Sequence, residues 1–78
     1  MTHADLVTIS GVTMTLQAAR LVEFCGINVR EDVRAMYEGD TNPKGLLADC
    51  LEGCEDEATE LLWRDYVSAV CVAAGVAS

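Results

Sequence analysis

Residues 6–15 read LVTISGVTMT, two short runs of β-forming residues on either side of a Ser-Gly pair. With Ser10 and Gly11 as a two-residue turn, each residue of the first run faces one of the second. Apolar side chains then share one face and threonines the other, a pattern typical of a half-buried hairpin. Two strands alone are only marginally stable, so the apolar face must pack on helices or pair with another chain. The innermost pairs are Ile9 with Val12, Thr8 with Thr13, and Val7 with Met14.

Start and stop signals after the hairpin predict two helices. Thr15 can cap a helix through LQAARLVEFC, and Gly26 suits the left-handed position just past its end. Asn28 and Glu31 have capping-box spacing ahead of a second apolar-periodic segment, which Gly39 closes.

The sequence of the second half of the chain predicts more helical structure. Asn42 with Pro43 begins a third helix through GLLADCLE, and the acids at 55–57 favour the start of a fourth that stops at Gly75. Gly53 either ends the third helix or only weakens one continuous helix, and this alternative stays open. The last helix is apolar over a wide surface, which indicates a central helix or one shared with a partner.

These elements predict one small α+β domain over residues 1–78. A β-hairpin at 6–15 packs on a bundle of three to four helices within 16–75. A chain of this size buries only about 60% of its unfolded surface, so its stability margin is thin.

The net charge of −8 is unevenly placed along the chain. Residues 31–65 hold eleven acids against Arg34, Lys44 and Arg64, whereas residues 66–78 carry no charge. A negative field repels nucleic-acid phosphates and attracts basic surfaces. We therefore expect no direct nucleic-acid binding and instead expect a basic DNA-binding surface of a protein complex as partner.

The stretch DCLEGCEDEATE, residues 49–60, concentrates six of these acids. On one continuous helix, four of them fall in a single sector about 16 Å long, a spacing of about 5 Å that is near the scale of phosphate charges. The stretch is either a solvated face that keeps the protein soluble or an imitation of a phosphate backbone. The candidate partner-binding residues are Asp49, Glu52, Glu55, Asp56, Glu57 and Glu60, extended by Glu31, Asp32, Glu38 and Asp40.

The four cysteines, Cys25, Cys50, Cys54 and Cys71, raise the alternatives of a metal site and a redox pair. Only two of them are close in sequence, unlike the paired ligands of structural zinc sites, so we predict reduced thiols packed as small hydrophobic groups. Neighbouring acids should keep the thiols protonated, and a Cys50–Cys54 disulfide would strain a regular helix. We expect no metal and no cofactor, and no role for His3.

Neither a catalytic motif nor a targeting segment is evident. The sequence holds no Ser-His-Asp arrangement and no glycine-rich phosphate loop, so we do not expect an enzyme. The opening residues lack a signal-peptide pattern, and the longest uncharged run, YVSAVCVAAGVAS, is too short for a membrane span. The expected location is the cytoplasm, in a bacterial host cell.

In overall character the chain resembles phage-encoded anti-defence proteins, particularly anti-CRISPR inhibitors that imitate DNA. The likeness rests on small size, acidity confined to one region and the lack of catalytic groups, with no shared motif. It implies a stoichiometric inhibitor that occupies the basic DNA-binding surface of a target such as a CRISPR surveillance complex.

Two other hypotheses remain open. The first is a small helical assembly module that uses the apolar residues from Tyr66 to Val76 as a dimer or partner interface. The sequence leaves open whether the protein is a monomer or a homodimer. The second is a cysteine-based metal or redox protein, which predicts bound zinc on purification.

Overall fold

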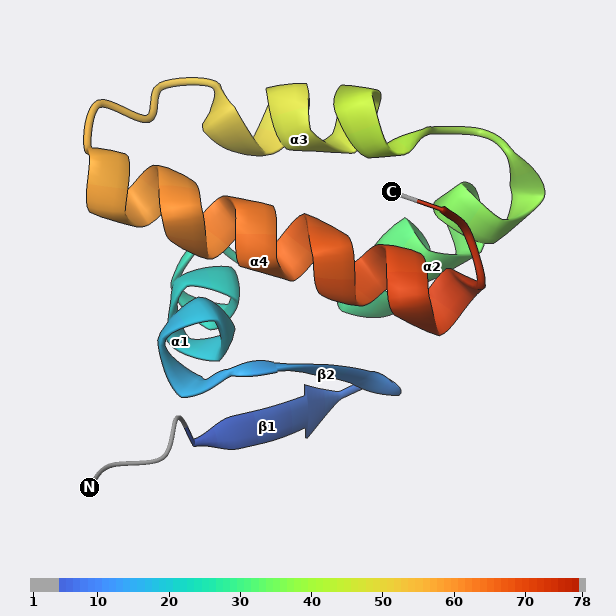
Figure 1. The fold of residues 1–78 in the computed structure, drawn as a ribbon, viewed down its shortest axis with the longest axis horizontal. Coiled ribbons are helices and arrows are strands. Elements are labelled where there is room, and N and C mark those ends of the chain that lie inside the picture. Colours follow the sequence, from blue (N-terminus) through green and yellow to red (C-terminus); the bar gives the residue numbers. More distant parts are fainter. Residues whose placement is uncertain (1–4, 78) are drawn as a thin grey trace.

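The computed structural model describes residues 5–77, and His3 lies outside this range. The predicted α+β fold is confirmed: an N-terminal hairpin is followed by four helices (Figure 1). The elements are β1 (Leu6–Ile9), β2 (Val12–Thr15), α1 (Leu16–Phe24), α2 (Val29–Glu38), α3 (Pro43–Leu51) and α4 (Glu57–Ala74).

The hairpin has the predicted register, with Ile9 facing Val12 and Val7 facing Met14. Ser10 and Gly11 both have positive φ, 51° and 85°, as a tight turn matched to strand twist requires. The apolar face packs inward, since Val12 and Met14 are buried. Of the two predicted alternatives, the apolar face of the hairpin therefore packs on the helices of its own chain.

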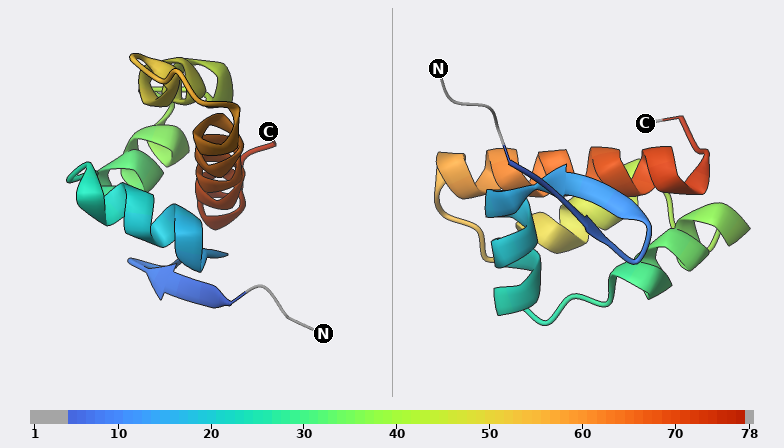
Figure 2. Two further views of the ribbon diagram at one scale, coloured as in Figure 1. Left: turned by 90° about the vertical axis from the view of Figure 1, so that its left-hand side faces the viewer. Right: turned by 90° about the horizontal axis from the view of Figure 1, so that it is seen from below.

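Helix α4 lies at the centre of the molecule, as its wide apolar surface predicts. It contacts β2 and all three other helices. Seen end-on in Figure 2, it has α3 above, α1 and α2 to one side and the hairpin below. Three sides of the helix are therefore covered, and its buried residues are Trp63, Tyr66, Val67, Val70, Cys71 and Ala74.

Tyr66 links several parts of this core. Its side chain is fully buried and meets the Trp63 ring edge to face, with ring centroids 6.0 Å apart. Its hydroxyl donates a hydrogen bond to the Asp32 carboxylate on α2. A large aromatic side chain is thereby buried without leaving its polar atom unpaired.

A second polar link joins α4 to the hairpin. Asp65 Oδ2 accepts hydrogen bonds from the Thr15 backbone N–H at 3.4 Å and from its hydroxyl at 3.2 Å. The Thr15 hydroxyl oxygen in turn accepts from the Ala18 N–H at 3.2 Å, which caps α1 as predicted. The point where strand becomes helix is thus fixed against the central helix.

The predicted caps at Asn28 and Asn42 are also present, and Asp56, predicted only as an acid that favours the start of the last helix, caps α4. Asn28, Asn42 and Asp56 accept backbone N–H groups of the first turns of α2, α3 and α4. The capping box at α2 is only half formed, because the Glu31 carboxylate pairs with Arg34 instead of returning to the cap.

The open question at Gly53 is resolved as two helices. α3 ends at Leu51, Glu52 is extended (φ −60°, ψ 122°), and Gly53 adopts φ 79°. Glycine takes this left-handed conformation at little cost, and the Cys54 N–H donates to the Leu51 carbonyl at 2.9 Å. The chain then turns back into α4.

Candidate functional site

We call the six acids from Asp49 to Glu60 the acidic junction, because they span the connection from the last turn of α3 to the first turn of α4. This connection lies at one end of the molecule (Figure 1). Five of the six are exposed and Glu60 is half-buried. The carboxylates gather where the chain reverses, at the far end of α4 from Gly75.

Of the two alternatives for Gly53, the structure has the broken helix, so the arrangement of these acids on one straight helix is not the one found. Asp49 lies on α3, Glu52 follows its end, and Glu57 lies on α4. The left-handed Gly53 separates the two helices, so the acids do not form one continuous helical stripe. They instead occupy two helix ends and the connection between them.

Two junction acids have partners within the chain. Glu60 accepts hydrogen bonds from Arg64, with 2.9 Å between Oε2 and Nη2. Asp56 accepts from the Thr59 N–H at 3.1 Å and from its hydroxyl at 2.9 Å, which caps α4. Within residues 5–77, four junction carboxylates make no side-chain hydrogen bond or ion pair: Asp49, Glu52, Glu55 and Glu57.

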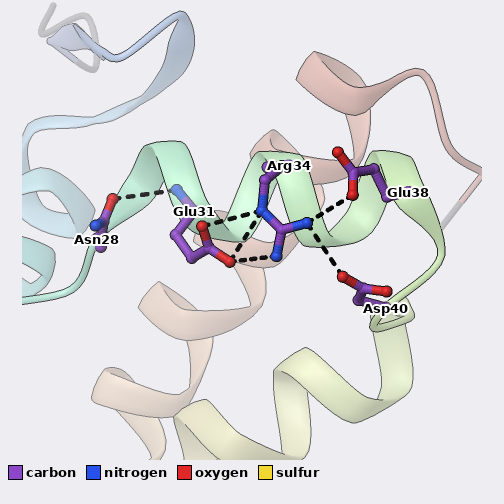
Figure 3. A network of polar contacts seen from close by, with 5 residues as sticks. All are labelled: Asn28, Glu31, Arg34, Glu38 and Asp40. Carbon is purple, nitrogen blue, oxygen red and sulfur yellow. Dashed lines mark hydrogen bonds and ion pairs between the residues drawn. The ribbon is translucent and has the colours of Figure 1, made fainter.

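The acids of α2, together with Asp40 just beyond its end, are placed differently. Arg34 pairs with Glu31, with Glu38 at 2.7 Å and with Asp40 at 3.1 Å (Figure 3). Its hydrogen bonds lower the pKa of Glu31. The fourth acid, Asp32, is half-buried and accepts the Tyr66 hydroxyl. These four acids therefore already have partners inside the protein.

A hollow of about 330 Å³ lies beside the acidic junction. It is bounded by the end of α1, the end of α3 and the first turns of α4. Apolar side chains, thiols and carboxylates all border it. Its lining includes Cys25, Asp49, Cys50, Glu52, Cys54 and Trp63.

The prediction that all cysteines pack as hydrophobic groups is wrong for Cys25. This residue caps the end of α1 and is exposed, whereas Cys71 is buried as predicted. Cys50 and Cys54 are half-buried. Burial and then the charges of Asp32, Asp49 and Cys25 raise the pKa of Cys50 to about 11, so its thiol is protonated at neutral pH.

Alkaline pH is expected to destabilise the fold. Burial raises the pKa of Cys50 and Cys71 above the ordinary thiol value of 9.0, and burial with the Asp32 hydrogen bond raises that of Tyr66 above 10.0. Unfolding lets these groups ionise, so the stabilisation is complete below pH 9 and is lost as pH rises through 9 to 11. Urea midpoints should fall over this interval, and less steeply for Cys50→Ala. Equal slopes for the two proteins would contradict the role of Cys50.

Within residues 5–77, no group of three or more His, Cys, Asp or Glu side chains is placed to hold a metal ion. Over the same residues, no helix combines the length and apolar character needed to cross a bilayer. No protein-family model, curated protein or solved structure matches the chain.

Sequence reasoning missed two arrangements around this site. The Arg34 network had a visible signal, because Glu31 and Glu38 lie three and four residues away on the same helix face. The placing of Cys25 and Cys50 on one hollow had none, since it depends on how α1 and α3 each pack on α4.

Proposed function

We propose that the protein is a non-enzymatic binding protein whose acidic junction occupies the basic DNA-binding surface of a protein complex. The observation that carries the proposal is the set of four exposed carboxylates at the junction that have no partner within residues 5–77. An ordinary salt-bridged surface would interleave lysine or arginine with them. Here the nearest arginine in sequence, Arg64, pairs with Glu60.

The crowded carboxylates of the junction favour binding to a cationic surface, because such a surface neutralises their charge. In water their mutual repulsion is screened over about 10 Å at 0.1 M salt, and it is relieved when lysine or arginine of a partner approaches. Complementary charge of this kind mainly accelerates association and selects the partner. We infer fast, salt-sensitive binding.

The acids of α2 and Asp40 just beyond it contribute less to this surface. Arg34 neutralises part of the charge of Glu31, Glu38 and Asp40, and Asp32 is held by Tyr66. A partner would have to displace these contacts before pairing with the carboxylates. We therefore centre the interface on the acidic junction and treat α2 as its edge.

The target class follows from the same chemistry. A basic surface that normally holds DNA offers lysines and arginines spaced to meet phosphates, and the junction presents carboxylates in their place. A CRISPR surveillance complex has such a surface, and blocking it would make this protein an inhibitor like the anti-CRISPR proteins that it resembles.

Capture from a bacterial lysate tests the proposal. The immobilised protein is exposed to nuclease-treated lysate at about 50 mM and about 500 mM NaCl, conditions that span strong and weak screening. DNA-binding proteins should be retained at low salt, released at high salt and displaced by added duplex DNA. Retention that neither salt nor DNA reduces would contradict the proposal.

Self-association is a second candidate, favoured by one observation. Val72 is 82% exposed on α4, in the uncharged final segment of the chain, beside a hollow of about 250 Å³ lined by Thr13 and Ala73. Burial of this side chain against a second copy would remove apolar surface from water. Sedimentation over a range of concentrations distinguishes the two candidates, because a dimer independent of salt favours self-association.

A further inference from the structure

Three of the four cysteines border the hollow beside the acidic junction. Cys25 comes from the end of α1, Cys50 from the last turn of α3, and Cys54 from the connection to α4. Residues far apart in sequence therefore bring nucleophilic side chains to one open space. Packing alone does not require this, since Cys25 is exposed.

The three thiols differ in what surrounds them. Cys25 faces solvent, and its charge is among the causes that raise the pKa of Cys50, which places these two sulfurs within electrostatic reach of each other. Cys54 is engaged elsewhere, because its Sγ donates to the Asp56 carbonyl at 3.4 Å. Cys25 and Cys50 are thus the two cysteines of this hollow whose sulfurs have no hydrogen-bond partner within residues 5–77.

We propose that Cys25 and Cys50 form a redox-sensitive pair that closes a disulfide across this hollow when a hydroperoxide is present. The Cys25 sulfur attacks the peroxide, which breaks the O–O bond, gives Cys25 sulfenic acid and releases one molecule of alcohol or water. The Cys50 sulfur then attacks the Cys25 sulfur, and the S–S bond forms as water leaves. This chemistry does not depend on the proposed partner.

The groups around Cys50 determine how fast the disulfide forms, because they control the ionisation of its thiol. Four titratable groups lie close enough to Cys50 to affect its ionisation or to be affected by it. They are Asp49 on the same helix, Asp32 on α2, Tyr66 on α4 and Cys25 just after α1. Attack requires the thiolate, whose fraction rises about tenfold per pH unit below the pKa of about 11. Closure should therefore be slow at neutral pH and accelerate steeply with pH.

The disulfide would join the end of α1 to the end of α3. Asp49, a junction acid without a side-chain partner within residues 5–77, is the neighbour of Cys50 in the same final turn of α3. Oxidation would therefore fix the geometry of one side of the acidic junction. Reduction by a thiol restores both cysteines.

Mass spectrometry tests the proposal on the full chain. The reduced protein is treated with hydrogen peroxide, alkylated and digested with trypsin. Cleavage after Arg20, Arg30, Lys44 and Arg64 separates peptide 21–30, which holds Cys25, from peptide 45–64, which holds Cys50 and Cys54. We expect these two peptides to be joined, with the link lost on reduction and its formation about tenfold faster per pH unit from pH 7 to pH 9.

Matched variants identify the pair. Cys54→Ser should still form the link, whereas Cys50→Ser and the exposed Cys25→Ser should not. Cys25→Ser keeps the test valid even if Cys50→Ser folds poorly, because Cys25 is not part of the packed core. Stable over-oxidation of Cys25 with Cys50 still reduced, a link between molecules, or a link lost in Cys54→Ser would each overturn the proposal.

Discussion

Replacing Tyr66 by alanine is expected to leave much of the protein unfolded at 25 °C. The side chain is fully buried at the centre of α4 and packs against Trp63. Removing a buried aromatic ring costs about 3–5 kcal/mol, and domains are stable by only about 5–15 kcal/mol, with small ones near the lower end. The loss is therefore comparable to the whole stability of a domain this small.

Tyr66→Phe is the matched control. It keeps the ring and removes only the hydroxyl that donates to the Asp32 carboxylate, so the expected loss is about 1.5–3 kcal/mol, smaller than that for alanine. Far-ultraviolet circular dichroism with urea titration separates the three proteins. A Tyr66→Ala protein that unfolds with the same urea midpoint as Tyr66→Phe would show that the ring is not central to the core.

Reversing Glu52 and Glu55 to lysine is expected to weaken binding to the proposed basic surface by about hundredfold or more. Both residues are exposed, and neither side chain takes part in a cap or an ion pair within residues 5–77. Reversal replaces two attractions by two repulsions, and disrupting interfacial charge pairs costs about 2–5 kcal/mol. Folding should be nearly unchanged, so binding is affected directly.

A second double reversal separates local contact from total charge. Asp5→Lys with Glu23→Lys changes the net charge by the same amount, from −8 to −4, at exposed positions before β1 and on α1. Calorimetric titration of captured partner should show a loss several times smaller for this control. Equal losses for the two variants would mean that overall charge, not the junction, governs binding.

Local sequence signals were sufficient to predict the hairpin and the first two helices of this fold. The Ser-Gly pair fixed the register of the hairpin, because the two-residue turn leaves one pairing that keeps the apolar residues together. Asn28 and Asn42 marked helix starts through side chains that accept nearby N–H groups. Such interactions act within a few residues and are visible in the sequence.

The candidate site depended on less local effects. Whether Gly53 interrupts a helix depends on the packing of α3 against α4, because glycine tolerates both outcomes. Asp32 looked like a surface acid, and its role as acceptor for Tyr66 appears only when α2 meets α4. The exposure of Cys25 likewise depends on tertiary structure, because this residue lies at the end of α1, where no other element within residues 5–77 covers it.

The central position of the last helix also bears on how the chain is made. The hairpin, α1, α2 and α3 all pack on α4, and Asp65 holds Thr15 fifty positions earlier in the chain. As the chain emerges from the ribosome, its first 56 residues can form the hairpin and its contacts with α1, but they lack the central helix on which β2, α1, α2 and α3 pack. Their shared core is complete only once α4 is synthesised, so we expect a chain truncated before Tyr66 to be degraded by proteases faster than the full chain.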